Sequence, residues 1–152
     1  MKNLIDNKNR HIHKLRVSLL DACNLRCLYC MPEEVVFQDY KNLLSVPEIL
    51  FICNELVKSG IDEIRLTGGE PTLRHDLLEI VNKLSELPLK KLGLTTNGTR
   101  ILNLLPEIAK TNCQYLNFSL DSLNSEKFTT ITRRPSFQKV MDSILKAKEL
   151  KF

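Results

Sequence analysis

The sequence predicts an α/β fold in which a parallel sheet forms a partial (β/α) barrel of about four strand–helix units. Short apolar segments of strand length alternate along the chain with longer segments that show helical periodicity. Glycine or polar residues follow each strand-length segment. The 152 residues are 43% hydrophobic, which suits one domain with a substantial core.

The expected strands and helices alternate regularly. Strands are expected at residues 15–20, 63–67, 91–96 and 115–120, and helices at residues 46–59, 76–87, 101–110 and 137–150. Ser45 is a candidate N-cap of the first helix, Pro47 and Glu48 suit its first turn, and Gly60 ends it. Pro106 is expected at a start or kink of the third helix. Helical crossovers between strands imply parallel pairing in right-handed units.

Residue parity separates an apolar face of this sheet from a polar one, because neighbouring strand residues point to opposite faces. The polar side collects Arg16, Ser18, Arg65, Thr67, Gly93, Thr95, Asn97, Asn117, Ser119 and Asp121. Two arginines on it indicate an anionic ligand, since buried charges need partners. The alternative is a flat sheet with one face in water, which is rare for parallel sheets.

Four polar motifs each follow or end a different predicted strand. They are the cysteine loop at residues 21–30, Gly68-Gly69-Glu70-Pro71, Thr95-Thr96-Asn97-Gly98 and Ser119-Leu120-Asp121-Ser122. Carboxyl ends of parallel strands meet at one edge of a sheet, where α/β folds place their chemistry. We therefore expect the four motifs to form one site.

The cysteines fall into two classes. Two of them, Cys53 and Cys113, stand alone beside apolar segments and are expected to be buried as small hydrophobes. Three lie within eight residues of a polar loop and are expected to bind a metal: Cys23, Cys27 and Cys30.

The spacing of the three clustered cysteines allows two kinds of metal site. His11 or His13 could complete a Cys3His zinc site. An iron–sulfur cluster held by three thiolates would instead leave one iron free for a small molecule. The polar face and the glycine motifs favour a site that holds ligands.

Charge and hydropathy exclude several function classes. The net charge of +4 is small and scattered, so no nucleic-acid partner is expected. No apolar run approaches the roughly 18 residues of a membrane helix, and residues 1–14 lack the apolar core of a signal peptide. We expect a cytoplasmic protein with no membrane partner.

At these residues the sequence resembles the radical S-adenosylmethionine (radical SAM) enzymes. Cys23-x3-Cys27-x2-Cys30, with Tyr29 before the third cysteine, is similar to their cluster-binding signature, and Gly68-Gly69-Glu70-Pro71 to their motif for the amino acid part of the cofactor. Six further motifs, between residues 15 and 132, resemble the GTP 3′,8-cyclases of molybdenum cofactor biosynthesis. They are Leu15-Arg16-Val17-Ser18, Cys30-Met31-Pro32-Glu33, residues 65–71, Thr95-Thr96-Asn97-Gly98, residues 117–123 and residues 128–132.

The resemblance implies a [4Fe–4S] cluster, S-adenosyl-L-methionine as cofactor and GTP as substrate. It implies that the cluster ligands are Cys23, Cys27 and Cys30. It assigns S-adenosylmethionine to Tyr29, Gly69, Glu70 and Ser119, with Glu70 near the amino group, and GTP to Arg16, Arg65 and Thr95. It identifies no catalytic side chain.

The reaction implied by the resemblance is that of a radical SAM lyase. The cluster, reduced by a partner protein, splits the carbon–sulfur bond of the cofactor, and the 5′-deoxyadenosyl radical abstracts the ribose 3′ hydrogen of GTP. Two alternatives belong to other classes: a different radical SAM enzyme, such as a peptide-modifying one, or a non-catalytic cysteine-rich zinc module or remnant.

Length distinguishes this chain from the family it resembles. Family members have further strand–helix units and a second cluster in a C-terminal region. We therefore expect residues 1–14 to be an N-terminal extension and residues 15–152 to be a core domain truncated before its fifth strand. The open edge of the fourth strand predicts self-association or a complementing C-terminal chain. Alone, the truncated chain is expected to cleave the cofactor without turning over GTP.

Overall fold

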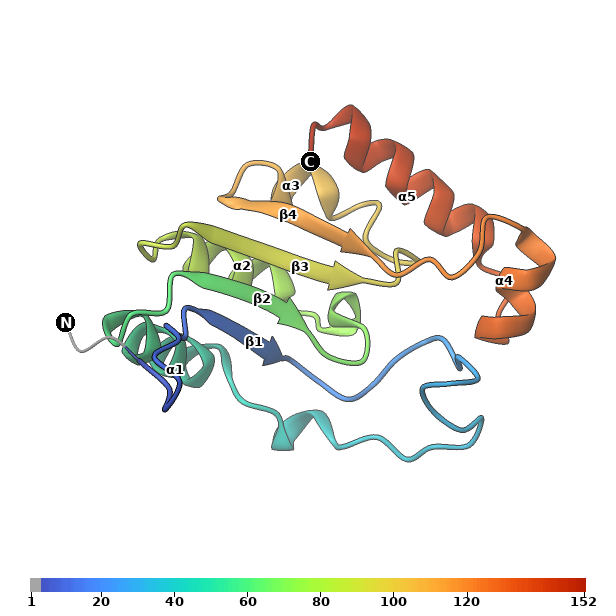
Figure 1. The fold of residues 1–152 in the computed structure, drawn as a ribbon. Coiled ribbons are helices and arrows are strands. Elements are labelled where there is room, and N and C mark those ends of the chain that lie inside the picture. Colours follow the sequence, from blue (N-terminus) through green and yellow to red (C-terminus); the bar gives the residue numbers. More distant parts are fainter. Residues whose placement is uncertain (1–3) are drawn as a thin grey trace.

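The computed structural model describes residues 4–152, and its centre is a four-stranded parallel sheet in the order β1-β2-β3-β4 (Figure 1). The strands are β1 Lys14–Ser18, β2 Glu63–Thr67, β3 Lys91–Thr96 and β4 Cys113–Phe118. All three pairings are parallel, so the four carboxyl ends lie at the same edge. The predicted α/β fold with a parallel sheet is confirmed.

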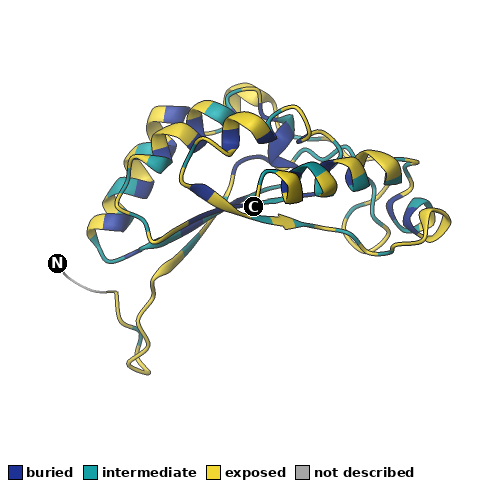
Figure 2. Cartoon of the chain, turned by 90° about the horizontal axis from the view of Figure 1, so that it is seen from above, coloured by how far each residue is buried: buried dark blue, intermediate teal, exposed yellow. Residues whose placement is uncertain are grey.

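Helices lie on one side of the sheet (Figure 2). They are α1 Val46–Lys58, α2 Leu77–Ser85, α3 Leu105–Ile108, α4 Ser125–Thr132 and α5 Phe137–Glu149, with 3-10 turns at Tyr40–Asn42 and Pro71–Leu73. Helix α1 begins as predicted, because the Glu48 carboxylate accepts hydrogen bonds from the Ser45 backbone N–H (2.8 Å) and hydroxyl (2.6 Å).

Two helix predictions differ from the structure. Helix α3 has only four residues, since its Pro106 lies in the first turn and the chain before it forms a turn in which the Leu104 N–H bonds the Ile101 carbonyl. Helix α4 was not predicted, because only Phe128 and Thr132 of its eight residues are buried and the apolar periodicity is weak.

The predicted apolar face packs beneath the helices. Its central side chains are almost fully buried, among them Ile64, Leu66, Leu92 and Leu94. The opposite face, called the polar face below, carries no helix among residues 4–152. The side chains that the strands contribute to it are those of Lys14, Arg16, Ser18, Glu63, Arg65, Thr67, Lys91, Thr95, Tyr115 and Asn117, with Gly93 between them.

Strand β4 begins two residues earlier than predicted and contains an irregularity. Leu92 pairs with Cys113, but the next residue, Gly93, pairs with Tyr115. The skipped residue, Gln114, is a bulge that reverses the parity of the strand. Cys113 can therefore face the core while Tyr115, two residues later, lies on the polar face.

The ends of the chain add little to the sheet. Of the N-terminal extension predicted over residues 1–14, the first three residues lie outside the described part; the next form a small hairpin with a bridge between Ile5 and His11. Among residues 4–152, no helix has both the length and the apolar character needed to cross a bilayer.

Candidate functional site

The four predicted motifs meet at the carboxyl edge of the sheet around one cavity of about 220 Å³, called the carboxyl-edge cavity below. Its walls come from the last residues of β2 and β3 and from the loops after all four strands: Cys23, Leu25, Cys27, Tyr29 and Cys30; Thr67, Gly68, Gly69 and Glu70; Thr95, Thr96 and Asn97; Ser119 and Asp121. As predicted, the four motifs come together at this edge, where they line one cavity.

Arg26 organises the cysteine loop from inside. Its guanidinium donates hydrogen bonds to the carbonyl oxygens of Cys23 (2.6 Å), Leu25 (2.8 Å) and Glu33 (3.0 Å). It also lies 5.1 Å from the centre of the Phe37 ring. One rigid donor group thus joins the first half of the cluster-binding signature to the backbone that follows it.

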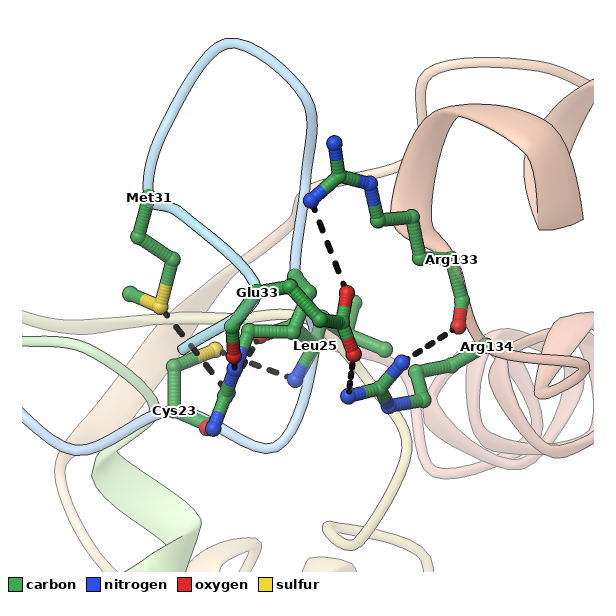
Figure 3. A network of polar contacts seen from close by, with 7 residues as sticks. Cys23, Leu25, Met31, Glu33, Arg133 and Arg134 are labelled. Carbon is green, nitrogen blue, oxygen red and sulfur yellow. Dashed lines mark hydrogen bonds and ion pairs between the residues drawn. The ribbon is translucent and has the colours of Figure 1, made fainter. Parts of the chain in front are cut away.

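The loop is docked on the C-terminal end of α4. The Arg26 N–H bonds the Thr132 carbonyl at 3.0 Å. Glu33 accepts hydrogen bonds from Arg134 at 2.6 Å and from Arg133 at 3.5 Å (Figure 3). Helix α4, which the sequence analysis missed, therefore supports the cysteine loop.

A small apolar cluster lies beneath the same loop. Leu25, in the middle of the cysteine signature, is almost fully buried against Phe128 of α4 and Val140 of α5. Cys23 and Cys27 pack at its border and are half-buried, whereas Cys30 is exposed. The Leu25 side chain thus anchors the loop to the apolar cluster, while the three cysteines line the cavity.

The glycine pair allows the second loop to reach the first. The Gly69 N–H bonds the Leu20 carbonyl (2.7 Å) and the Glu70 N–H bonds the Ala22 carbonyl (2.8 Å). A Cβ at position 69 would overlap the carbonyl oxygens of Asp21 and Ala22. Gly68 has φ +150°, a conformation that side chains disfavour. Glycine is required here because two backbones touch.

Glu70 joins the loops after β2 and β3 through a buried carboxylate. Its Oε1 accepts hydrogen bonds from the Thr72 N–H (3.1 Å), the Thr72 hydroxyl (2.6 Å) and the Thr96 hydroxyl (2.7 Å). Its Oε2 accepts one from the Asn97 N–H (2.6 Å). All four donors are neutral, and Oε2 has a lone pair left for another donor.

A ring of side chains that the sequence analysis did not identify joins the first and third loops. The Asn97 amide donates to Asn24 (2.9 Å), Asn24 donates to the Thr99 hydroxyl (2.7 Å), and that hydroxyl donates to the Asn97 oxygen (2.7 Å). The Asn97 amide also reaches Cys23 Sγ at 3.7 Å. The only available signal was the position of Asn97 in the third motif.

The fourth loop closes the cavity through a tyrosine. The Tyr29 hydroxyl lies 3.0 Å from both carboxylate oxygens of Asp121. Ser119 is placed by its N–H, which bonds the Thr96 carbonyl at 2.9 Å. Tyr29, Gly69, Glu70 and Ser119, which the resemblance assigned to one ligand, do line one cavity.

The charge of the carboxyl-edge cavity suits a cationic ligand and a thiolate-bound metal. Among its lining residues, two carry carboxylates, three carry thiols and none is a lysine or arginine. Burial raises the pKa of Cys23 and that of Cys27, so these thiols stay protonated until a metal displaces the protons. S-adenosylmethionine carries a sulfonium and an ammonium group, and these two positive charges suit the acidic side chains of the lining.

The histidines of the rival zinc site lie elsewhere. His11 and His13 line a separate cavity with Gly60, Asp62 and Lys90, beside the start of β1 and away from the carboxyl edge. Within residues 4–152, no three His, Cys, Asp or Glu side chains converge on a single ion position. The three cysteine thiols still line one cavity, as thiolates that each bind a different iron of a cluster would need to do.

A second cavity, of about 410 Å³, hollows the polar face near the amino ends of the strands; it is called the arginine cavity below. It is lined by Lys14, Leu15, Arg16, Glu63, Ile64, Arg65, Lys91, Gly93 and Tyr115. Arg16 and Arg65 are directly paired across β1 and β2, and neither has an ion-pair partner among residues 4–152. Like charges facing each other are unfavourable, and an anion bound between the two guanidinium groups would offset this repulsion.

The structure divides the three residues that the resemblance assigned to GTP. Arg16 and Arg65 line the arginine cavity, whereas Thr95 lines the carboxyl-edge cavity with the cysteines. The Thr95 hydroxyl is buried and has no hydrogen-bond partner among the described residues. An unpaired buried hydroxyl on a cavity wall is free to contact a ligand.

The two isolated cysteines are core residues, as predicted. Cys53 and Cys113 are buried in α1 and β4. Burial raises the pKa of Cys53 to about 11 and that of Cys113 to about 12. Both thiols are therefore neutral and take no part in the site.

Comparison with curated proteins finds close relatives that are much longer. The chain is 47% identical over 143 residues to "GTP 3',8-cyclase" of Synechocystis, covering 94% of this chain and 44% of that protein. It is 48% identical over 149 residues to "Molybdenum cofactor biosynthesis protein 1" of Bos taurus, covering 97% and 24%. The chain thus spans between a quarter and a half of these relatives.

Solved structures show the same fold. Streptococcus suis SuiB bound to S-adenosylmethionine superposes with a TM-score of 0.72 at 22% identity, covering 91% of this chain and 32% of SuiB. BtrN in complex with AdoMet and 2-DOIA gives 0.56 at 18% identity, covering 93% and 56%.

The family is settled by a match along most of the chain. The model of the Radical SAM superfamily matches residues 17–152, which include the cysteine signature and all four loops of the carboxyl-edge cavity. The chain therefore belongs to the radical SAM superfamily.

Proposed function

We propose that the chain carries the cofactor site and part of the substrate site of a radical SAM lyase that acts on GTP, as in the GTP 3′,8-cyclases. In this proposal Cys23, Cys27 and Cys30 hold a [4Fe–4S] cluster whose remaining iron binds S-adenosylmethionine. When bound, the two cofactors supply reductive cleavage of a carbon–sulfur bond and hence a carbon radical.

The proposed cofactor contacts follow from the loops around the cavity. Glu70 Oε2, which keeps an unused lone pair, would accept a hydrogen bond from the ammonium group of S-adenosylmethionine. Gly69 would let the ligand approach the backbone, and Ser119 would contact it from the end of β4. Tyr29 would cover the ligand, with Asp121 fixing its hydroxyl.

One observation favours a nucleotide substrate: the arginine cavity lies on the same polar face as the carboxyl-edge cavity. A substrate held by Arg16 and Arg65 at its phosphates can present its ribose to the cofactor site. Thr95, whose hydroxyl is unpaired, would contact it between the two. The 47% identical relative named GTP 3′,8-cyclase supports GTP as that nucleotide.

The length of the relatives limits what these residues can do alone. The matched region makes up 44% of the cyanobacterial GTP 3′,8-cyclase. We propose that turnover of GTP needs further protein, from an additional segment or a second chain, and an electron-donor protein. Cleavage of S-adenosylmethionine requires only the carboxyl-edge cavity.

The test is anaerobic reconstitution with iron and sulfide, followed by dithionite and S-adenosylmethionine, with chromatography for 5′-deoxyadenosine. We expect iron with acid-labile sulfide and the formation of 5′-deoxyadenosine. A Cys27→Ala variant should lose both, whereas the matched control Cys53→Ala should retain both. Zinc without sulfide in the purified protein would contradict the proposal and support the zinc module.

A peptide-modifying radical SAM enzyme is the second candidate. Its support is the fold shared with SuiB, which has been solved bound to its precursor peptide, at a TM-score of 0.74 and 22% identity. Binding of GTP to the reconstituted protein, lost in Arg65→Ala, favours the nucleotide. Absence of GTP binding by both the wild type and Arg65→Ala would favour the peptide.

A further inference from the structure

A second charged row crosses the polar face beside the two arginines. Lys14, Glu63 and Lys91 are paired in register across β1, β2 and β3. The Glu63 carboxylate holds both lysines, with Nζ–O distances of 3.1 Å to Lys14 and 3.1 Å to Lys91. All three side chains line the arginine cavity.

The charges of the arginine cavity do not balance. Four of its lining side chains are basic and only Glu63 is acidic. Glu63 is fully engaged by the two lysines, and both lysines keep donors that it does not use. The cavity therefore has basic groups in two parallel rows, one of lysines held by Glu63 and one of arginines that have no ion-pair partner within residues 4–152.

The rows are spaced for a chain of phosphates. Successive residues on one face of a strand lie about 6.6 Å apart, roughly the distance from the first to the third phosphorus of an extended triphosphate. Gly93 leaves the arginine row without a side chain on β3, and the Arg65 guanidinium lies against that gap, 3.4 Å from a Cβ placed there.

We propose that Lys14 and Lys91, held in place by Glu63, form a subsite for the terminal phosphate of a nucleoside triphosphate. The inference rests on the proposed function, because it takes the ribose to face the carboxyl-edge cavity. The phosphates then extend away from that edge, first over Arg16 and Arg65 and then over the lysine row. The row would make the site select triphosphates over diphosphates.

The test is titration calorimetry of the full chain with GTP, GDP, ATP and inorganic tripolyphosphate. In a Lys14→Gln/Lys91→Gln variant, the affinity for GTP should fall about tenfold while that for GDP changes less than twofold. The matched control is Lys90→Gln, because Lys90 is a neighbour in sequence but pairs with Asp62 and lines another cavity.

A second variant changes the subsite in the opposite direction. Glu63→Gln removes the one negative charge of the cavity, so it should raise the affinity for GTP severalfold more than that for GDP. Equal loss of GTP and GDP in the double lysine variant, or an equal loss in Lys90→Gln, would overturn the subsite. Binding of neither triphosphate nor tripolyphosphate by the folded wild-type chain would overturn it as well.

The same titrations separate this inference from the proposed function. Lysine-dependent binding of tripolyphosphate, with GTP bound no more tightly than tripolyphosphate, would leave the phosphate subsite standing and refute the placement of a nucleoside between the two cavities. Binding of GTP that is tighter than that of tripolyphosphate but independent of both lysines would refute the subsite and leave the proposed function standing.

Discussion

Replacing Glu70 by Gln should break the joint between the loops of the carboxyl-edge cavity. The carboxylate accepts three hydrogen bonds at Oε1 and one at Oε2, but an amide has only one accepting oxygen. In the orientation that costs least, the oxygen keeps the three donors and the new NH2 group faces the Asn97 N–H. One buried donor then has no partner.

The expected cost follows from these bonds. A buried unpaired N–H costs about 1–3 kcal/mol, and three charge-assisted bonds that become neutral lose about 1 kcal/mol each. Glu70→Gln also removes the free-energy cost of burying a carboxylate that has no cationic partner. This gain is similar in size to the loss from the three weakened hydrogen bonds. We therefore expect Glu70→Gln to lower the free energy of unfolding by about 2 kcal/mol.

Urea unfolding followed by circular dichroism measures this change, with Glu79→Gln as the control, since Glu79 is exposed on α2 and makes no side-chain hydrogen bond among the described residues. Calorimetry should also show weaker S-adenosylmethionine binding to reconstituted Glu70→Gln. Unchanged or increased stability would refute the reasoning, because it would mean that the bonds from Thr96 and Asn97 to Glu70 do not hold the two loops together.

Three further experiments test the packing of the core and of the loops at the carboxyl edge. Arg74→Met should cost about 3–5 kcal/mol in urea, because buried Arg74 pairs with Asp76 at 2.6 Å and bonds two carbonyls. Burial would raise the pKa of Asp76, but the bonds and charge of Arg74 outweigh it and lower that pKa. The pair thus stabilises the fold above the ordinary carboxyl pKa and loses this effect as pH falls through the lowered pKa; acid titration of stability should show a weaker dependence in the variant. Gly69→Ala should cost about 3 kcal/mol, measured in the same way, since its methyl group overlaps backbone. Cys53 and Cys113 should react with iodoacetamide at pH 8 only after unfolding, as mass spectrometry of the native and urea-treated chain can show.

Each of these predictions has a control or a result that would contradict it. Arg100→Met, at an exposed position, should leave the acid titration of stability unchanged. If Gly69→Ala were as stable as the wild type, the close contact between the first two loops would be wrong. Labelling of Cys53 in the native chain would place that thiol outside the core.

Several features could be read from the sequence because they depend on local pattern. Alternation of apolar and polar residues was sufficient for β2 and β3, whose bounds match the prediction. Ser45 and Glu48 marked the start of α1 because a capping box is a local motif. The four loops could be placed at one edge because parallel strands share their direction.

Other features depend on contacts between distant residues. The bulge at Gln114 arises from pairing with β3, so no local pattern announced that Cys113 and Tyr115 face opposite sides. Helix α4 has little periodicity of its own and is stabilised through Phe128 beneath the cysteine loop. The Asn24–Asn97 hydrogen bond joins positions 73 residues apart.

By itself, the sequence determined the parallel sheet, the clustering of three thiols and the polar character of one face, since each follows from residue order and strand parity. Only the tertiary structure decided how that face is divided. It placed Thr95 with the thiols and joined Lys14 to Lys91 through Glu63. The physical reason is register: which side chains share a cavity depends on how neighbouring strands are aligned, and that alignment is a property of the packed sheet.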